Sequence, residues 1–490
     1  MQINRTIAEL EPTPLWNQFH QLTSIPRPSH HETAVQQYVM ALGERSGLEV
    51  VRDEVGNVIV RKPATKGMED RVGVILQGHL DMVPQANSGV EHDFARDPIK
   101  TVLEGDWVTA EDTTLGADNG IGVAAALAVL ESKDIKHGPI EALFTANEED
   151  GMGGAFGLKP GLLQGGMLIN MDSEEEGVLS ICCAGGANVN TRHTYRLESI
   201  DSGMKAFRLS VSGLKGGHSG VDIHRGRGNA NKLLFRLLRT GADCFGLKIT
   251  EIAGGNMRNA IPREAFAVVC LPEEAGEQFE NFVSEAYAEC LAELQQVEEG
   301  LKIECQPAPL PQQVMNWGSQ QQLISAVCAC PHGPLRMSDV MPGMVETSTN
   351  LAIVNVRQGR IEVFNLSRSM VDTALDETCL SIKGLFDLMG AQSTIDGKYP
   401  GWQPNVESAA LKTVQEAYRH CFDDEVVVGG IHAGLECGIL GATYPHWDMI
   451  SFGPTISFPH SPDERVHIPS VGRFWQLLLR TLAEVPKRQS

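Results

Sequence analysis

The stretch Val74-Ile75-Leu76-Gln77-Gly78-His79-Leu80-Asp81 decides the fold class. Its apolar start predicts a buried strand over 72–76, and its end places a histidine and an aspartate directly after that strand. Side chains two positions apart share one face of an extended chain, so His79 and Asp81 can act together. Taken alone, the pair also fits an ordinary His–Asp contact at the start of a surface loop.

The same alternation of apolar runs and helical stretches continues on both sides. Further strands are expected over 140–144 and 167–171, and helices over 14–22, 31–46 and 120–130. Strand–helix–strand alternation predicts an α/β domain with a mostly parallel sheet.

The character of the chain changes near Cys182-Cys183-Ala184-Gly185-Gly186. Beyond it, strands are expected over 206–211, 265–271 and 361–366, and helices over 229–239, 274–294 and 372–389. After Lys398-Tyr399-Pro400-Gly401-Trp402 the α/β pattern returns, with helices over 407–418 and 471–482 and strands near Val426 and Met449. We therefore expect a catalytic domain made of residues 1–186 and 400–490, interrupted by an inserted α+β lid over 187–399.

Composition excludes several classes of function. The 490 residues suggest two to four domains at about 150 residues each. Lys and Arg number 40 against 62 Asp and Glu, and the net charge of -22 argues against nucleic acid or an anionic membrane as a partner. No apolar run approaches the ~20 residues that span a bilayer. The 11 cysteines form no CxxC pair, which favours a reduced, cytoplasmic location.

Acidic side chains lie next to three of these expected elements. Asp118 lies between Gly116 and Gly120 before a helix, where it could be a metal ligand or simply the helix cap. Glu148 and Glu149 follow the strand over 140–144, and neighbouring acids there repel one another unless a cation neutralises them. A solvated loop is the alternative for these two residues.

Two more segments complete the set. Asp172 follows the strand over 167–171, and His460 lies in the Pro-rich loop Phe458-Pro459-His460-Ser461-Pro462. Open α/β sheets place their sites at the carboxyl ends of the strands, and a mixed set of His, Asp and Glu suits zinc. The set of five ligands, with the types His, Asp, Glu, Asp and His, exceeds the four that usually bind one structural zinc. A site for two metal ions that share one carboxylate therefore fits better.

The motifs now on the page resemble a known family. The segments that resemble co-catalytic di-zinc peptidases and acylases, related to carboxypeptidase G and aminoacylase, are Gly78-His79-Leu80-Asp81-Met82-Val83-Pro84, Gly116-Ala117-Asp118-Asn119-Gly120, Glu148-Glu149 and Pro459-His460-Ser461. The segments that resemble the bacterial aminoacyl-histidine dipeptidases (peptidase D, carnosinase-like) are Leu214-Lys215-Gly216-Gly217-His218-Ser219-Gly220, Arg258-Asn259-Ala260-Ile261-Pro262-Arg263-Glu264, Pro400-Gly401-Trp402-Gln403-Pro404 and Ile431-His432-Ala433-Gly434-Leu435-Glu436-Cys437-Gly438.

The resemblance implies a role for each site residue. Asp118 would bridge two Zn²⁺ ions, with Co²⁺ or Mn²⁺ as alternative metals. His79 and Asp172 would complete one metal site, and Glu149 and His460 the other. In addition, Asp81 would orient His79, and Glu148 would be the general base that takes the proton of a metal-bridging water.

The expected lid also supplies candidates. By the resemblance, His218 would stabilise the oxyanion, and Arg368 would clamp the free carboxylate of a dipeptide, as a guanidinium can. Asn259 is a further candidate for binding the substrate backbone. Taken without the family, His218 also fits an ordinary loop histidine and Arg368 a surface arginine. The resemblance further implies a homodimer through the lid.

The function implied is a cytosolic zinc dipeptidase that hydrolyses Xaa-His dipeptides such as β-alanyl-histidine (carnosine). A related di-zinc tripeptidase or N-acyl amino-acid deacylase is the near alternative, and a non-catalytic peptide- or metal-binding protein is the alternative from another class. The preference for histidine comes from the resemblance alone. The sequence does not give substrate breadth, the native metal or the oligomeric state.

Overall fold

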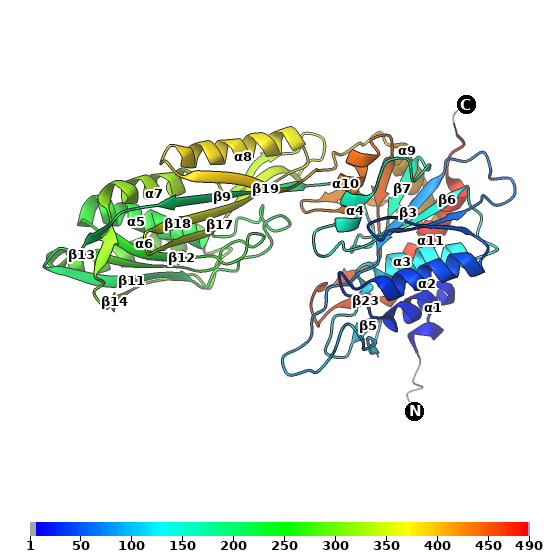
Figure 1. Ribbon diagram of the computed structural model, residues 1–490, viewed down its shortest axis with the longest axis horizontal. Coiled ribbons are helices and arrows are strands. Elements are labelled where there is room, and N and C mark those ends of the chain that lie inside the picture. The colour runs from blue at the N-terminus through cyan, green and yellow to red at the C-terminus, as the bar shows by residue number, and fades with distance from the viewer. Residues whose placement is uncertain (1–5, 489–490) are drawn as a thin grey trace. The chain divides into compact units, whose positions relative to one another are not determined.

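The computed structural model describes residues 6–488 and divides the chain into two units. Unit 1 combines the N-terminal part through Cys182 with Pro404–Gly430 and the part from Leu435 onward. Unit 2 combines Cys183–Gln403 with the short segment Ile431–Gly434 (Figure 1). One unit is therefore inserted into the other.

The boundaries between the units lie a few residues outside those expected from the sequence. Unit 2 begins at Cys183 and ends at Gln403, where 187 and 399 were predicted. The reason is backbone pairing: Cys183 and Trp402 exchange N–H···O hydrogen bonds of 3.1 and 3.0 Å. That the segment Ile431–Gly434 belongs to unit 2 was not predicted. The segment pairs with unit 2 because the N–H of Ala184 lies within hydrogen-bonding distance of the carbonyls of Ile431 and Ala433.

Unit 1 is built on an eight-stranded sheet with the order β1-β2-β6-β3-β7-β21-β8-β20. Its centre is parallel, since β3 pairs with β6 and β7, and β21 pairs with β7, all in parallel. The pairs β1–β2, β2–β6 and β21–β8 are antiparallel. The sheet that the sequence predicted as mostly parallel thus has a parallel centre and antiparallel flanks.

The helices and strands expected in unit 1 are present at the predicted positions, and several strands and the short helices η1, α4 and α10 are additional. The elements of unit 1 are η1 Ile7–Glu9, α1 Thr13–Thr23, α2 Thr33–Arg45, β1 Glu49–Arg52, β2 Val58–Lys62, β3 Val74–His79, β4 Thr101–Glu104, β5 Trp107–Ala110, α3 Ala117–Glu131, β6 Ile140–Thr145, α4 Gly153–Gly157, β7 Met167–Asn170, β8 Val178–Cys183, α9 Ala409–Phe422, β20 Val427–Ile431, α10 Glu436–Thr443, β21 Asp448–Ser451, β22 Ile456–Ser457, β23 Arg465–His467 and α11 Ile468–Glu484.

The central strands of unit 1 are buried along their whole length. Every residue of β3, β6 and β7 is buried, which explains why these strands are mostly apolar in the sequence. In α3, every residue from Ala117 to Leu130 is buried, and the helix packs against β3. The strand ends that carry the site residues therefore project from a rigid core.

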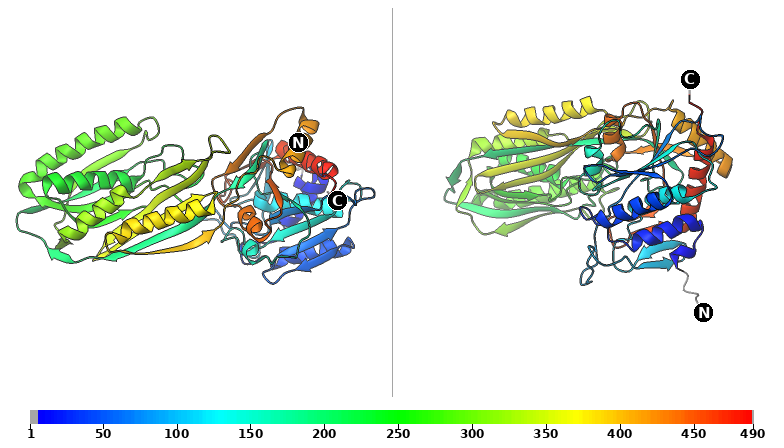
Figure 2. Two further views of the ribbon diagram at one scale, coloured as in Figure 1. Left: turned by 90° about the horizontal axis from the view of Figure 1, so that it is seen from above. Right: turned by 45° about the vertical axis from the view of Figure 1, so that its right-hand side comes forward.

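Unit 2 is an α+β unit around a sheet with the order β14-β11-β13-β12-β17-β18-β9-β19, and β16 pairs with β17. The helices α5, α6, α7 and α8 lie along one face of this sheet (Figure 2) and share one hydrophobic core with it. The elements are β9 Gly185–Thr194, β10 Leu197–Ser199, β11 Met204–Ser212, α5 Ala230–Phe245, β12 Lys248–Gly254, β13 Ala265–Pro272, η2 Glu273–Ala275, α6 Gly276–Leu294, β14 Lys302–Ala308, β15 Gln313–Met315, α7 Trp317–Ala329, β16 Gly333–Met337, β17 Val345–Arg357, β18 Arg360–Ser369, α8 Asp372–Asp387 and β19 Gln392–Tyr399.

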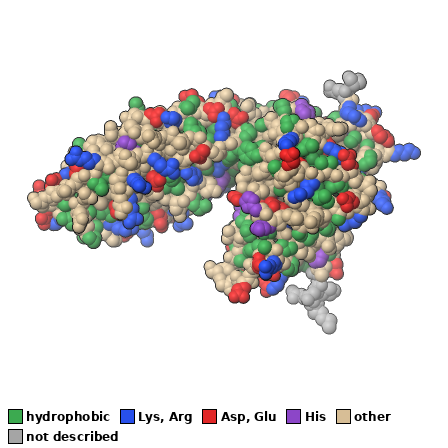
Figure 3. Space-filling model, viewed as in Figure 1, with side chains coloured by type: hydrophobic (Ala, Val, Ile, Leu, Met, Phe, Trp, Pro, Cys, Tyr) green, Lys and Arg blue, Asp and Glu red, His purple; other side chains and the backbone are tan. Residues whose placement is uncertain are grey.

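Charge on the molecular surface is mixed. On the face shown in Figure 3, acidic and basic side chains are interspersed, and no continuous basic area is seen on that face. Among residues 6–488, no helix combines the length and the apolar composition needed to cross a membrane.

Candidate metal centre

Three parallel strands bring their carboxyl ends together. In the sheet β3 lies between β6 and β7. His79 is the last residue of β3, Glu148 and Glu149 follow the end of β6, and Asp172 follows the end of β7. These four side chains were expected at strand ends from the sequence, and the strand order makes them neighbours.

Asp118 lies at the centre of the site, between two imidazoles. Its Oδ1 is 3.1 Å from Nε2 of His79, and its Oδ2 is 3.1 Å from Nε2 of His460. Asp118 follows the N-cap Gly116 with non-helical backbone angles (φ −80°, ψ 112°), and both oxygens of its carboxylate lie close to imidazole nitrogens. One carboxylate therefore faces two separate groups of ligands.

The remaining acids complete those two groups. Asp172 Oδ1 lies 3.3 Å from Nε2 of His79, and Glu149 Oε2 lies 3.0 Å from Nε2 of His460. Within the described residues, the atoms of His79, Asp118 and Asp172 come within 4.8 Å of one another, and so do those of Asp118, Glu149 and His460. The two groups share only Asp118.

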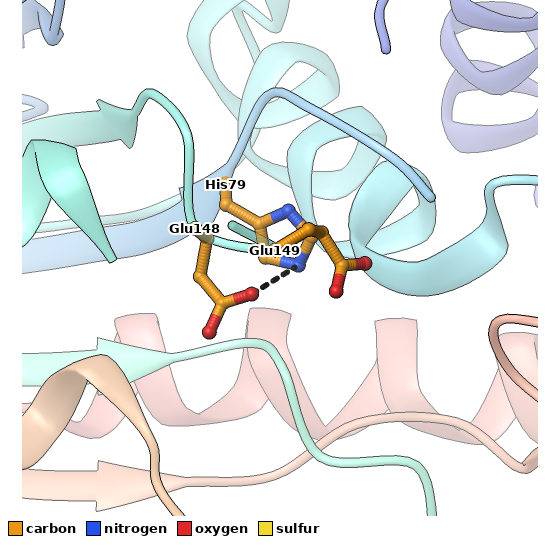
Figure 4. A group of neighbouring side chains, drawn as sticks. All are labelled: His79, Glu148 and Glu149. Carbon is orange, nitrogen blue, oxygen red and sulfur yellow. Dashed lines mark ion pairs between the residues drawn. The ribbon is translucent and has the colours of Figure 1, made fainter. Parts of the chain in front are cut away.

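The adjacent glutamates point in different directions. Figure 4 shows the carboxylates of Glu148 and Glu149 on different sides of the His79 ring. Glu148 Oε2 lies 4.0 Å from Nε2 of His79, farther than the carboxylates of Asp118 and Asp172. Glu149 instead approaches His460. Glu149 thus belongs to the group of Asp118 and His460, while Glu148 forms a third possible group with His79 and Glu149.

Asp81 makes hydrogen-bonding contacts with His79, Glu148 and Glu149, and each contact involves a backbone group. Nδ1 of His79 lies 3.1 Å from the backbone oxygen of Asp81 and 3.5 Å from its carboxylate. The carboxylate itself accepts hydrogen bonds from the N–H groups of Glu148 and Glu149, at 2.9 and 3.1 Å. The sequence suggested only an effect on His79. The contact with the two glutamates depends on a loop 67 residues away.

The pKa shifts follow from several carboxylates and two imidazoles lying close together in the site. Burial raises the pKa of Glu148 well above its ordinary value, and that of Asp172 to about 6. Hydrogen bonds to Asp118 and Glu149 raise the pKa of His460 to about 11. Although burial favours the neutral acid, the neighbouring His79 ring and backbone N–H groups lower the pKa of Asp81 to about 2. A divalent cation bound here would displace the protons that these shifts favour.

The residues present fit a pair of zinc ions. Oε1 of Glu149 and Oδ1 of Asp172 are buried and lack hydrogen-bond donors among the described residues. Two imidazole nitrogens and carboxylate oxygens form the mixed N/O donor set that zinc binds. The carboxylates of Asp118, Glu148, Glu149 and Asp172 together also match the charge of two divalent ions.

The lid candidates lie together within unit 2. Arg368 is 5% exposed at the end of β18, and it donates to Tyr399 Oη at 2.9 Å and to Ser219 Oγ at 3.3 Å. Nε2 of His218 lies 3.4 Å from Nη2 of Arg368. Burial, and then Arg368, lower the pKa of His218 to about 4. The imidazole is therefore neutral at pH 7 and can act as a donor only from one nitrogen.

Asn259 joins the lid cluster through its backbone. Its carbonyl accepts a 2.8 Å hydrogen bond from the N–H of Ser219, and its residue surface is exposed. Arg368 is buried, so the alternative that it is an ordinary surface arginine is wrong. The roles of His218, Arg368 and Asn259 toward a substrate stay predictions.

Sequence reasoning missed two buried charged residues behind the metal centre, Arg27 and Glu464. Each is 2% exposed and contacts the backbone that leads to Asp118. Their partners are main-chain groups, which carry no residue-specific signal. The only clue was position: Glu464 follows His460 by four residues, and Arg27 stands between two prolines.

The chain is similar to known proteins over almost its whole length. The sequence profile of "Peptidase family M20/M25/M40" matches residues 75–484. A cytosol non-specific dipeptidase of Escherichia coli (strain K12) is 45% identical over 483 residues, which cover 98% of this chain and 99% of that protein.

Solved structures show the same similarity. The aminoacylhistidine dipeptidase from Vibrio alginolyticus is 44% identical with a TM-score of 0.92, and 99% of each chain is covered. A tripeptidase from Staphylococcus aureus is 16% identical with a TM-score of 0.57, covering 97% of this chain and 99% of that one, and this likeness concerns the fold alone.

Proposed function

The chain belongs to the peptidase family M20/M25/M40, and we propose that it is a zinc-dependent dipeptidase that hydrolyses Xaa-His dipeptides such as β-alanyl-histidine. Hydrolysis of peptide bonds is the activity that its full-length relatives' names share. The observation that carries the metal proposal is Asp118, whose two oxygens each lie 3.1 Å from a different imidazole. Two Zn²⁺ per chain are proposed, with Co²⁺ or Mn²⁺ as alternatives.

The proposed ligands are divided between two metal positions. His79 and Asp172 would hold one ion and Glu149 and His460 the other, with Asp118 shared. Zinc ions held here would lower the pKa of a water and polarise the scissile carbonyl.

Glu148 is the proposed general base. It would accept the proton of the attacking water at a carboxylate oxygen and then deliver it to the leaving amine. Its raised pKa in the metal-free site reflects burial first, and the charge of bound zinc opposes that effect. The carboxylate of Asp81 accepts a hydrogen bond from the backbone N–H of Glu148. This bond would keep the position of the general base constant during the proton transfer.

For unit 2 we propose roles in substrate binding. Arg368 would bind the free carboxylate of a dipeptide through its guanidinium, which its bonds to Tyr399 and Ser219 hold in place. His218 would donate from one ring nitrogen to the developing oxyanion. Asn259 is proposed to bind the substrate backbone. A homodimer through the lid and a cytoplasmic location complete the proposal, and light scattering tests the first of these.

Which dipeptides the protein hydrolyses is a separate question from its class of activity. One full-length relative is named a non-specific dipeptidase and another an aminoacylhistidine dipeptidase, so similarity supports dipeptides as the class. The proposed preference for histidine needs its own test.

One preparation should be used for metal analysis and for a substrate panel. The panel would contain carnosine, other Xaa-His and Xaa-Leu dipeptides, a tripeptide and an N-acetyl amino acid. We expect two zinc ions per chain and the highest kcat/KM on an Xaa-His dipeptide. Equal rates on all dipeptides would remove the histidine preference. Faster turnover of the tripeptide or the N-acetyl amino acid would replace the dipeptidase assignment, and bound zinc without any hydrolysis would replace it with a binding function.

A further inference from the structure

Two buried opposite charges lie behind the metal centre and have no part in the proposed chemistry. Arg27 precedes α2, and Glu464 immediately precedes β23. Burial of a charged group is costly unless hydrogen bonds compensate it, so their partners show what the two residues do.

Arg27 connects the two loops that carry Asp81 and Asp118. Its Nη1 donates to the backbone oxygens of Leu80 and Asp81, at 2.9 and 3.0 Å. Its Nη2 donates to the backbone oxygen of Gly116. One planar guanidinium thereby holds main-chain groups of both loops in a fixed relation.

Glu464 binds the other side of the Asp118 loop. Its Oε2 accepts from the N–H groups of Leu115 and Gly116 at 2.8 and 2.9 Å. Its Oε1 accepts from those of Ala117 and Asp118 at 2.8 and 3.2 Å. These N–H groups lie in the segment that leads into α3, in which Asp118 and Asn119 have non-helical backbone angles.

The two charges meet at Gly116. Its N–H is bound by Glu464 and its carbonyl by Arg27, and its φ of +72° is a conformation that favours glycine. A Cβ atom on Gly116 would lie 2.6 Å from Nη2 of Arg27, and one on Gly120 would lie equally close. The glycines on both sides of Asp118 thus leave room for the guanidinium.

We infer that Arg27 and Glu464 are positioning residues that set the backbone before Asp118, so that its two carboxylate oxygens face both ligand groups before metal binds. Neither residue has a place among the ligands or the reacting groups. Their effect is on preorganisation, because a loop held from both sides loses less freedom when the metals bind. The inference rests on the proposed two-metal function of the site.

The decisive variant is Glu464→Gln, which keeps the size and replaces an acceptor with an amide donor facing N–H groups. We expect its zinc affinity, measured by competition with a chromophoric chelator, to fall roughly 10–100-fold, as for other groups that orient ligands. Asp463→Asn is the matched control, because the neighbouring Asp463 is exposed. Its affinity should equal that of the wild-type protein.

Arg27→Lys separates charge from geometry. Lysine keeps the positive charge but has one nitrogen, which cannot span the carbonyls of both loops. We expect Arg27→Lys to weaken zinc binding, and Arg27→Met to weaken it further.

Two readouts distinguish positioning from a general loss of stability. The visible absorption spectrum of the Co²⁺-loaded Glu464→Gln protein should differ from that of the wild type. Its kcat should fall while KM for a dipeptide stays unchanged. Wild-type zinc affinity and an unchanged Co²⁺ spectrum in a folded Glu464→Gln protein would overturn the inference.

If Glu464→Gln fails to fold, Gly116→Ala tests the positioning role of Arg27 and Glu464 instead. It adds a methyl group beside Nη2 of Arg27 without removing either charge. Weakened zinc binding supports the inference, and wild-type affinity overturns it. A wild-type protein that binds no divalent metal would overturn the proposed function as well, whereas normal metal binding by every variant overturns the positioning role alone.

Discussion

The carboxylate of Asp81 accepts a 2.9 Å hydrogen bond from the backbone N–H of Glu148. Its second oxygen accepts from the N–H of Glu149 at 3.1 Å and from Ser29 Oγ at 2.8 Å. Because Asp81 also contacts His79 through its backbone oxygen, a single residue connects a proposed ligand with the proposed base. This contact gives Asp81 a second role beside orienting the imidazole.

Replacement of Asp81 by Asn tests that role. The amide would place a donor against the N–H of Glu148 or Glu149, so we expect kcat to fall by roughly 10–100-fold with little change in KM. Steady-state kinetics on a dipeptide gives both constants. Asp150→Asn is the control, because the Asp150 side chain is 74% exposed and pairs with His30. Wild-type kcat in Asp81→Asn would show that these bonds do not position the base.

The neighbours Glu148 and Glu149 should respond differently to the same change. Glu148→Gln removes the proposed base, and kcat should fall by at least ~10²–10⁴-fold with both zinc ions and substrate affinity retained. Glu149→Gln removes a charged ligand, so one zinc should bind more weakly and excess zinc should restore part of the activity. Metal analysis and turnover at increasing zinc concentration measure these effects.

Comparison of the two variants also shows which results would contradict the roles proposed for Glu148 and Glu149. Zinc at any concentration should leave Glu148→Gln inactive. Rescue of that variant, with no rescue of Glu149→Gln, would reverse the two roles. Normal turnover and full metal content in both would disprove the site assignment.

Arg368→Met tests the carboxylate clamp. Loss of the guanidinium should raise KM steeply for free dipeptides and only slightly for C-terminally amidated ones, since the amide carries no charge to bind. Arg357→Met provides the control, because the Arg357 side chain is 74% exposed. Equal losses on free and amidated substrates would count against a clamp.

Zinc binding should release protons. In the metal-free protein the carboxylates of Asp118 and Glu149 raise the pKa of His460 to about 11, so its ring carries a proton at pH 7. A zinc ligand must be unprotonated, so metal competes with that proton and zinc affinity should rise as pH rises from 6 to 8. Calorimetry in buffers of different ionisation enthalpy measures the protons released. His460→Ala should release fewer, and an equal number would exclude this source.

The fold could be predicted where a strand is mostly apolar. The strands β3, β6 and β7 are buried along their whole length, and the sequence shows them as apolar runs. The strand β17, Val345–Arg357, was not predicted, because it buries the polar segment 347–350. The hydrogen bonds that make this burial tolerable, such as the one between Ser348 and His432, connect residues 84 positions apart.

The amino-acid sequence alone is enough to predict which side chains stand at the ends of the central strands. Parallel strands end at the same edge of a sheet, so apolar runs followed by His79, Glu148 and Asp172 imply a shared site. The tertiary structure decided how Asp118 is held, through Arg27 and Glu464. Both act on backbone N–H and C=O groups, which every residue carries alike. Only the folded chain shows which of these identical groups a buried charge binds.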